Sequence, residues 1–249
     1  MNFVAVAHTP LAPDRVPARI AYRAAGVGGA APIVFLHGGW GYAMYPFDRQ
    51  IDAFAPTRRI VIPDRSGYGE SPAIDALPSD FHERAMRETL AVLDALALDR
   101  PIVWGHSDGA IIALLLALSA PDRVSAIVSE ATHFFRRKPA SQAFFENVLA
   151  NAASTPIMRA HARAWLDIGR HAASAVDDFY GGRLGDLRVR TLLVHGARDP
   201  RTEPGEIDAL RRAAPQIDPR VFADAGHSPH SEAASADAVT AAVARFLDA

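Results

Sequence analysis

The sequence predicts a doubly wound α/β fold with a mostly parallel central sheet. Short apolar runs alternate with helix-like segments along most of the 249 residues, which is typical of parallel strands covered by helices. Residues 32–36 are continuously apolar, as expected of a strand buried on both faces. A third observation is the pattern Gly-x-Ser-x-Gly at residues 105–109, placed between an apolar run and a helix-forming segment.

The individual strands and helices are predicted from the spacing of hydrophobic residues and from the Gly- and Pro-rich turns between them. Strands are expected at residues 3–6, 19–23, 32–36, 59–62, 101–104, 124–128, 189–195 and 220–222. Helices are expected at residues 44–54, 80–98, 110–118, 141–152, 157–171, 203–213 and 235–247. Ser79-Asp80 is the candidate N-cap of the second helix.

Residues 131–187 interrupt the alternation, because they contain helix-like stretches and no strand pattern. We therefore expect a core made of residues 1–130 and 188–249, with residues 131–187 inserted as a helical cap. Open α/β sheets bind ligands at the carboxyl ends of their strands, and the cap is expected to lie there. Its aromatic residues are expected mainly to fill the cap, with Phe144, Phe145 and Trp165 as candidate substrate contacts.

Composition excludes several classes of function. The formal charge of −2 gives no reason to expect nucleic acid or a membrane as partner. Without cysteine, the chain has neither disulfides nor thiolate metal sites, and its ten histidines form no tight cluster, so we expect no metal and no cofactor. The N-terminus does not resemble a signal peptide. The expectation is a cytoplasmic monomer or homodimer acting on a small molecule.

The Gly-x-Ser-x-Gly pattern predicts a nucleophile elbow, a sharp turn that holds its central residue in a strained conformation. Side chains at Gly105 and Gly109 would collide with the adjoining strand and helix. The turn would lift the Ser107 hydroxyl clear of the sheet and direct the next backbone N–H toward the same space. Ser107 is therefore the candidate nucleophile.

Four further motifs occur in register with the elbow: His37-Gly38-Gly39, the loop from Asp64 to Ser71, Asp199, and Gly226-His227. With these motifs, the chain resembles the α/β-hydrolase superfamily over nearly its whole length. The family order of nucleophile, acid and histidine is obeyed. The Ser-Asp-Gly elbow also resembles that of the valacyclovir-hydrolase-like branch.

The resemblance implies a triad of Ser107, His227 and Asp199. A serine hydroxyl needs a base within hydrogen-bond reach, imidazole can take and return a proton near neutrality, and a carboxylate fixes the imidazole tautomer. His230 is the alternative base. Glu130, at the end of the preceding strand, is the alternative acid, although we expect it instead to anchor the entry to the cap.

Two backbone N–H groups are expected to bind the oxyanion. One is that of Asp108, and the other comes from Gly39, with Trp40 as the alternative. Trp40 and Asp108 are also candidate substrate contacts, and the Asp108 carboxylate could attract a substrate ammonium or merely brace the elbow. His37 is expected to brace its loop, and residues 136–138 to form a solvated basic face.

The predicted function is hydrolysis of an ester of a small organic molecule through an acyl-enzyme. Amide, lactone and carbon–carbon hydrolysis use the same constellation and stay open. So does a ligand-binding receptor or sensor without turnover, because fold does not fix function. Haloalkane dehalogenases and epoxide hydrolases of this superfamily need a carboxylate nucleophile, so the serine at position 107 argues against both activities.

Overall fold

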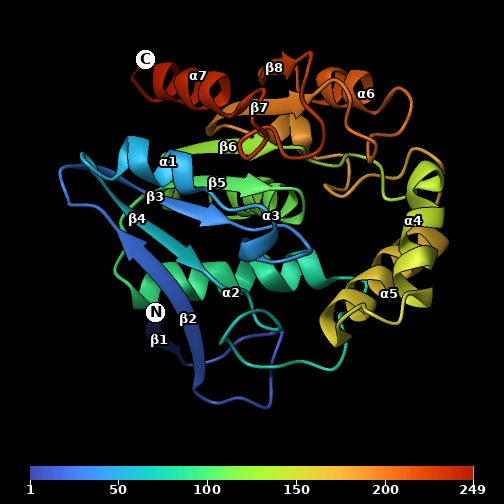
Figure 1. Ribbon diagram of the computed structural model, residues 1–249, viewed down its shortest axis with the longest axis horizontal. Coiled ribbons are helices and arrows are strands. Elements are labelled where there is room, and N and C mark those ends of the chain that lie inside the picture. Colours follow the sequence, from blue (N-terminus) through green and yellow to red (C-terminus); the bar gives the residue numbers. More distant parts are fainter. Residues whose placement is uncertain (249) are drawn as a thin grey trace.

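The computed structural model describes residues 1–248, apart from the side chain of Asp218, and confirms the predicted α/β fold (Figure 1). One eight-stranded sheet runs through the molecule in the order β1-β2-β4-β3-β5-β6-β7-β8. Its strands are β1 Asn2–Val6, β2 Ala18–Ala25, β3 Ala30–Leu36, β4 Arg58–Pro63, β5 Ile102–His106, β6 Ala126–Glu130, β7 Arg190–Gly196 and β8 Asp218–Phe222.

The sheet is parallel from β4 to β8, and only β2 pairs antiparallel with its neighbours β1 and β4. Helices α2 (Phe81–Ala95) and α3 (Asp108–Ser119) cover one face, while α1 (Asp48–Phe54) and α7 (Ala236–Asp248) cover the other (Figure 1). The remaining core helix, α6 (Glu206–Ala213), lies between β7 and β8 in the chain.

Each face of the sheet has its own hydrophobic core, which explains why β3 is apolar at successive positions. Val34 and Leu36 belong to the core beneath α2 and α3, whereas Ile33 and Phe35 belong to the core beneath α1 and α7. Successive side chains of a strand point to opposite faces, so a strand covered on both faces loses the alternation between polar and apolar residues.

Three helices are shorter than the sequence predicts, and one of them, α6, begins at Glu206 and not at residue 203. The first was expected from residue 44, but Tyr42–Met44 form a separate 3-10 turn and α1 begins at Asp48, because Pro46 disfavours helical geometry at the residue before it. Helix α2 ends at Ala95, since Ala97 has φ 48°. Asp80 occupies the N-cap position, but its carboxylate accepts a bond from Arg84 instead of a helix N–H.

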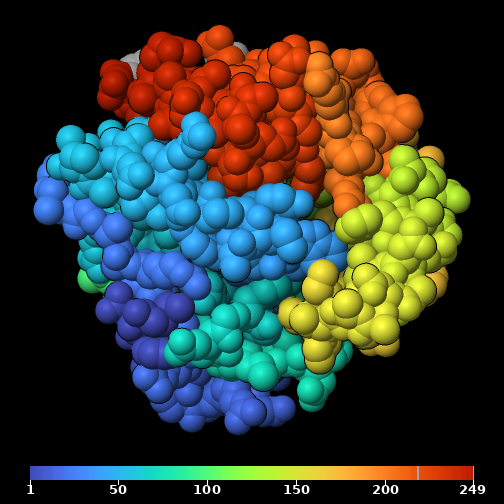
Figure 2. Space-filling view, viewed as in Figure 1, coloured from blue at the N-terminus to red at the C-terminus, as the bar shows by residue number. Residues whose placement is uncertain are grey.

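Residues 131–187 fold into α4 (Pro139–Ala150), α5 (Pro156–His171) and a short 3-10 turn, with one isolated bridge between Phe135 and Asp178 and no named strand in this fully described stretch. The two helices pack against each other beside the ends of the central strands (Figure 1). In Figure 2 their green and yellow surface abuts the light-blue segment that follows β3.

The basic run at the start of this segment is only partly the predicted solvated face. Arg137 is exposed and Arg136 half-buried, but Lys138 is buried because its ammonium pairs with Glu206 at 2.5 Å. The partner lies on α6, far along the chain, which is why the local sequence does not reveal the ion pair.

Among residues 1–248, no helix is long and apolar enough to cross a membrane.

Candidate active site

The elbow forms as the sequence predicts. Ser107 lies between β5 and α3 with φ 55° and ψ −117°, a backbone conformation that L-residues rarely adopt. A Cβ on Gly105 would overlap the backbone of Gly109, and a Cβ on Gly109 would overlap the carbonyl of Leu36. Both positions therefore require glycine.

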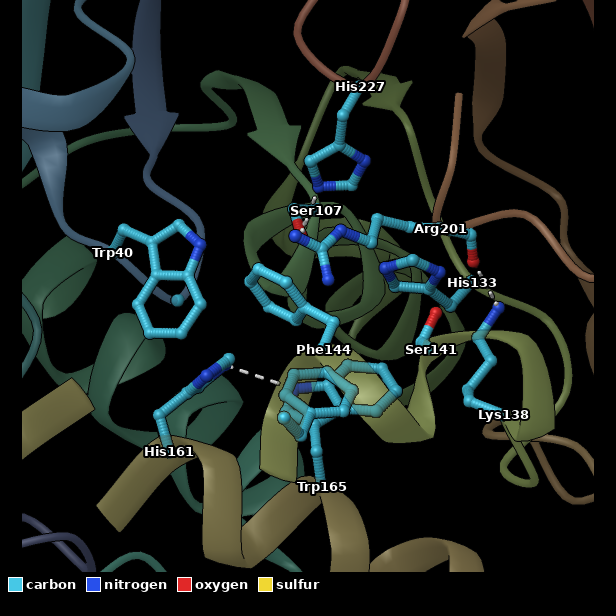
Figure 3. Close-up of a pocket in the computed structure, with 12 residues that line it drawn as sticks. Trp40, Ser107, His133, Lys138, Ser141, Phe144, His161, Trp165, Arg201 and His227 are labelled. Atoms are coloured by element: carbon cyan, nitrogen blue, oxygen red, sulfur yellow. Dashed lines mark hydrogen bonds between the residues drawn. The ribbon is translucent and has the colours of Figure 1, made fainter. Parts of the chain in front are cut away.

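In the predicted triad, His227 lies within hydrogen-bond distance of both Ser107 and Asp199. His227 Nε2 lies 3.1 Å from Ser107 Oγ (Figure 3). His227 Nδ1 lies 2.9 and 3.0 Å from the two carboxylate oxygens of Asp199. With the proton on Nδ1, the imidazole donates to Asp199 and its Nε2 accepts from the serine hydroxyl. The hydroxyl is thus aligned for deprotonation.

Asp199 follows β7, and His227 lies in the loop that follows β8. Gly196 lets the two loops meet, because a Cβ there would overlap the backbone of Ala225 and Gly226. Burial alone would raise the pKa of Asp199, but the hydrogen bond and charge of His227 hold that pKa below its usual value. The carboxylate is therefore ionised at neutral pH.

The alternative acid and base bind each other instead of joining the triad. Glu130 Oε1 accepts from the backbone N–H of His230 and lies 2.8 Å from His230 Nδ1, while Oε2 accepts from Trp104. His230 Nε2 lies 3.2 Å from the carbonyl of Tyr45. Glu130 thus anchors the histidine loop, and not the entry to the cap as expected.

A third histidine supports the same loop. His106 Nε2 donates to the backbone carbonyl of His227 at 2.9 Å. Burial lowers the pKa of His106 to about 3, so this ring is neutral and carries its proton on the donating nitrogen. Glu232 completes the support by accepting from the N–H groups of Gly226 and Ser228.

The candidate oxyanion donors are the backbone N–H groups of Asp108 and of Gly39 or Trp40. Asp108 is the first residue of α3, so its N–H lies outside the hydrogen bonds of the helix itself. Gly39 and Trp40 line the same pocket as Ser107. The loop is braced by His37, whose Nδ1 lies 2.7 Å from the Gly38 carbonyl and whose Nε2 accepts from the N–H of Arg65.

The side chain of Asp108 does not line the pocket. It is fully buried, with hydrogen bonds from His82 on α2 at 3.1 Å and from His161 and Trp165 on α5 at 2.7 and 3.1 Å. Arg65 lies 3.6 Å away. This carboxylate has no accessible oxygen for a substrate ammonium, and it braces the elbow against both α2 and α5.

We expect Asp108→Asn to lower the free energy of unfolding by about 3 kcal/mol, because removing one member of a buried ionic network leaves its partners without compensation. Burial would raise the pKa of Asp108, but His161 and His82 hold it well below its usual value. The stabilisation is therefore present above the unfolded-state pKa of ~3.9 and is lost as the pH falls further.

Urea unfolding at pH 7 and at pH 3 measures both effects. The difference between wild type and Asp108→Asn should shrink at the lower pH. Asp80→Asn is the matched control, since the Asp80 carboxylate is half-exposed in a surface pair with Arg84. This substitution should lower the free energy of unfolding by less than about 1 kcal/mol. If the two substitutions lower the free energy of unfolding equally, the buried network around Asp108 stabilises the protein no more than a surface ion pair does.

The pocket above Ser107 combines residues from the core with residues from α4 and α5 (Figure 3). Trp40, Phe144, Phe145 and Trp165, all predicted substrate contacts, line it. Phe145 stacks on Trp165 with ring centroids 5.6 Å apart, and Trp40 meets the edges of Phe144 and His161.

Several pocket residues were missed by sequence reasoning. They are His133, Lys138, Ser141, His161 and Arg201. Arg201 lies two residues after Asp199, so its proximity to the acid is a signal that the sequence does contain. The others depend on how α4 and α5 pack. Among the residues that the structure describes, no group of three or more histidine or acidic side chains could hold a metal ion.

This fold and this arrangement of serine, histidine and aspartate define a hydrolase of the α/β class. A family model described as the alpha/beta hydrolase fold matches residues 31–156, half of the chain. The chain belongs to the α/β-hydrolase family.

Relatives with several different activities are similar to it. Epoxide hydrolase 2 of Siraitia grosvenorii is 28% identical over 54% of this chain, a match that covers only 41% of that relative. A 2-hydroxy-6-oxononadienedioate/2-hydroxy-6-oxononatrienedioate hydrolase of Burkholderia vietnamiensis is 29% identical over 86% of both chains. A thermophilic esterase from Thermogutta terrifontis, solved with malate bound, superposes with a TM-score of 0.73 at 21% identity over 100% of this chain and 98% of its own.

Proposed function

We propose that this protein is a serine hydrolase that cleaves an ester of a small organic molecule through an acyl-enzyme. The observation that carries the proposal is the continuous relay from Ser107 Oγ through His227 to Asp199, with Ser107 and His227 both lining the same pocket. No cofactor is needed for this chemistry.

In the proposed mechanism Ser107 Oγ attacks the ester carbonyl as His227 Nε2 takes its proton. The oxyanion is held by the N–H groups of Asp108 and Gly39. His227 then protonates the leaving alcohol, and a water activated by the same imidazole releases the acid. Asp199 remains ionised throughout and stabilises the imidazolium.

Epoxide hydrolysis is the alternative raised by the relatives. In the epoxide hydrolases of this superfamily a carboxylate is the nucleophile, whereas position 107 is serine here. The adjacent carboxylate, Asp108, is fully buried among His82, His161 and Trp165. It has no path to a substrate carbon, so the residues favour acyl transfer.

Amides, lactones and carbon–carbon bonds remain alternative substrates, and a receptor without turnover remains the alternative from another class. The test is steady-state hydrolysis of matched p-nitrophenyl esters, anilides, lactones and an epoxide. We expect the esters to have the highest kcat/KM. Binding of esters without turnover would favour the receptor, and preferred opening of the epoxide would contradict the proposal.

The helical segment 131–187 is proposed to act as a cap that sets acyl-chain preference. Phe144 is half-buried, faces Trp40 across the pocket and has no polar side-chain atom to satisfy. Phe144→Ala should therefore increase kcat/KM for p-nitrophenyl octanoate relative to the acetate by about tenfold, since each buried methylene contributes ≈ 0.8 kcal/mol. An unchanged ratio would remove Phe144 from the specificity determinants. Phe145 and Trp165 are less suitable probes because they stack on each other and Trp165 binds Asp108.

A further inference from the structure

The pocket beside Ser107 contains basic side chains and, among the described residues that line it, no acidic one. Two of the lining residues, Lys138 and Arg201, are cationic. The charge of Lys138 is balanced, because its ammonium lies 2.5 and 2.6 Å from the two carboxylate oxygens of Glu206. The charge of Arg201 is not balanced in this way.

Among the carboxylates whose side chains the structure describes, none forms an ion pair with the Arg201 guanidinium. Asp199 attracts the guanidinium electrostatically, but its carboxylate is hydrogen-bonded to His227. The guanidinium lies over the ring of Phe144 and extends toward Ser107 in Figure 3. Burial lowers the pKa of Arg201, yet an arginine stays protonated in proteins. The pocket therefore holds a permanent cation without a paired anion.

The main chain of Arg201 is fixed from both sides. Its N–H donates to Asp199 Oδ1 at 2.8 Å, and its carbonyl accepts from Lys138 Nζ at 3.1 Å. The Lys138–Glu206 ion pair thus positions the main chain from which the guanidinium extends into the pocket. Such pre-organisation lowers the entropy lost when a ligand binds.

Three other polar atoms at the pocket are buried and lack partners. They are the hydroxyl of Ser141, on α4, Nδ1 of His133, and Nδ1 of His161, whose ring is already held through Nε2 by Asp108. Buried polar atoms are nearly always hydrogen-bonded, so each orphan calls for an explanation. Burial holds the pKa of His133 well below its usual value; the ring is neutral and carries one N–H. A hydroxyl and an imidazole N–H can both donate to an oxygen anion.

We propose that Arg201, assisted by Ser141 and His133, binds a carboxylate group of the substrate. The natural substrate would then be a small ester that carries a negative charge a few bonds from the scissile carbonyl. The guanidinium fork matches a carboxylate in a bidentate arrangement. This inference rests on the proposed ester hydrolysis, since it names the substrate class of the same site.

The test compares charged and neutral esters of equal carbon number. On the acyl side these are 4-nitrophenyl hydrogen succinate and 4-nitrophenyl butyrate; on the alcohol side they are 4-acetoxybenzoate and 4-methylphenyl acetate. In one of the two pairs, wild type should favour the carboxylate ester in kcat/KM. Arg201→Gln should reduce this charged-to-neutral ratio about ten- to a hundredfold, the typical contribution of a charge-assisted hydrogen bond.

Because the ratio is measured within each variant, a general loss of turnover cancels. Arg201→Lys should restore part of the preference, as it keeps the charge but loses the fork. Arg198→Gln is the matched control: this arginine belongs to the same loop but is exposed and paired with Asp224, so the ratio should stay at the wild-type value. Absence of a preference in both pairs, or a ratio unaffected by Arg201→Gln, overturns the proposal.

A binding measurement keeps the carboxylate site distinct from ester hydrolysis. Calorimetric titration with glutarate should give binding to wild type that weakens at least tenfold in Arg201→Gln. If neutral esters are hydrolysed through Ser107 but glutarate binds both proteins equally, the anion site fails and the proposed function stands. If no ester is hydrolysed but glutarate binding depends on Arg201, the proposed function fails and the anion site stands.

Discussion

Ser107→Ala should reduce kcat for p-nitrophenyl acetate by a factor on the order of 10⁶, as expected when the nucleophile of a serine triad is removed. The structural reason is that Ser107 Oγ is the atom that His227 Nε2 contacts at 3.1 Å. The measurement is initial-rate hydrolysis at pH 8. Background hydrolysis without enzyme sets its lower limit.

The substitution removes one buried oxygen and keeps the Cβ, so the elbow should still fold. Circular dichroism and the thermal midpoint are expected to match those of wild type. Ser125→Ala, at a serine before β6 and away from the pocket, is the control and should keep full turnover. Activity in Ser107→Ala close to the wild-type value would exclude Ser107 as the nucleophile.

The second large effect is expected for the acid of the triad. Asp199→Asn keeps the shape of the side chain but can no longer fix the His227 tautomer that leaves Nε2 free to accept, a loss that costs on the order of 10⁴ in kcat. Both carboxylate oxygens of Asp199 lie within 3.0 Å of His227 Nδ1. The residual rate is measured as p-nitrophenyl acetate hydrolysis at high enzyme concentration, in assays that are quenched after fixed times.

Glu130→Gln provides the matched comparison, because this second buried carboxylate also holds a histidine of the same loop. Its partner, however, is His230 and not His227. We expect Glu130→Gln to lower the thermal midpoint while keeping kcat within about tenfold of wild type. A reversed result, with Glu130→Gln inactive and Asp199→Asn active, would assign the acid to Glu130.

The positions of the strands along the chain were predictable, because each strand is a local pattern in the sequence. A parallel strand that is buried on both faces appears in the sequence as a continuous apolar run, as β3 does. The Gly-x-Ser-x-Gly pattern of the elbow marks the junction of β5 and α3. The ends of the helices were harder to predict, because each end is set by the backbone conformation of one or two residues. Pro46 and the positive φ of Ala97 set limits to α1 and α2 that hydrophobic spacing does not reveal.

In the candidate site, the three residues whose identity the chemistry dictates were predictable, and their charge partners were not. Lys138 is buried because of Glu206, 68 residues later, and Asp108 is occupied by His82, His161 and Trp165 from two other helices. A sequence shows that a carboxylate follows the nucleophile, but only the packing of α2 and α5 shows that its oxygens are already satisfied. Arg201 is unpaired for the same reason, since every nearby carboxylate is directed elsewhere.

The most direct test of the central claim, that Ser107 is an activated nucleophile, is covalent labelling with a fluorophosphonate followed by peptide mass spectrometry. We predict one equivalent of label, located on Ser107, with the labelling rate strongly reduced in His227→Ala and label absent from Ser107→Ala. Failure of wild type to react, or a label on another residue with equal rates in wild type and Ser107→Ala, would contradict the account.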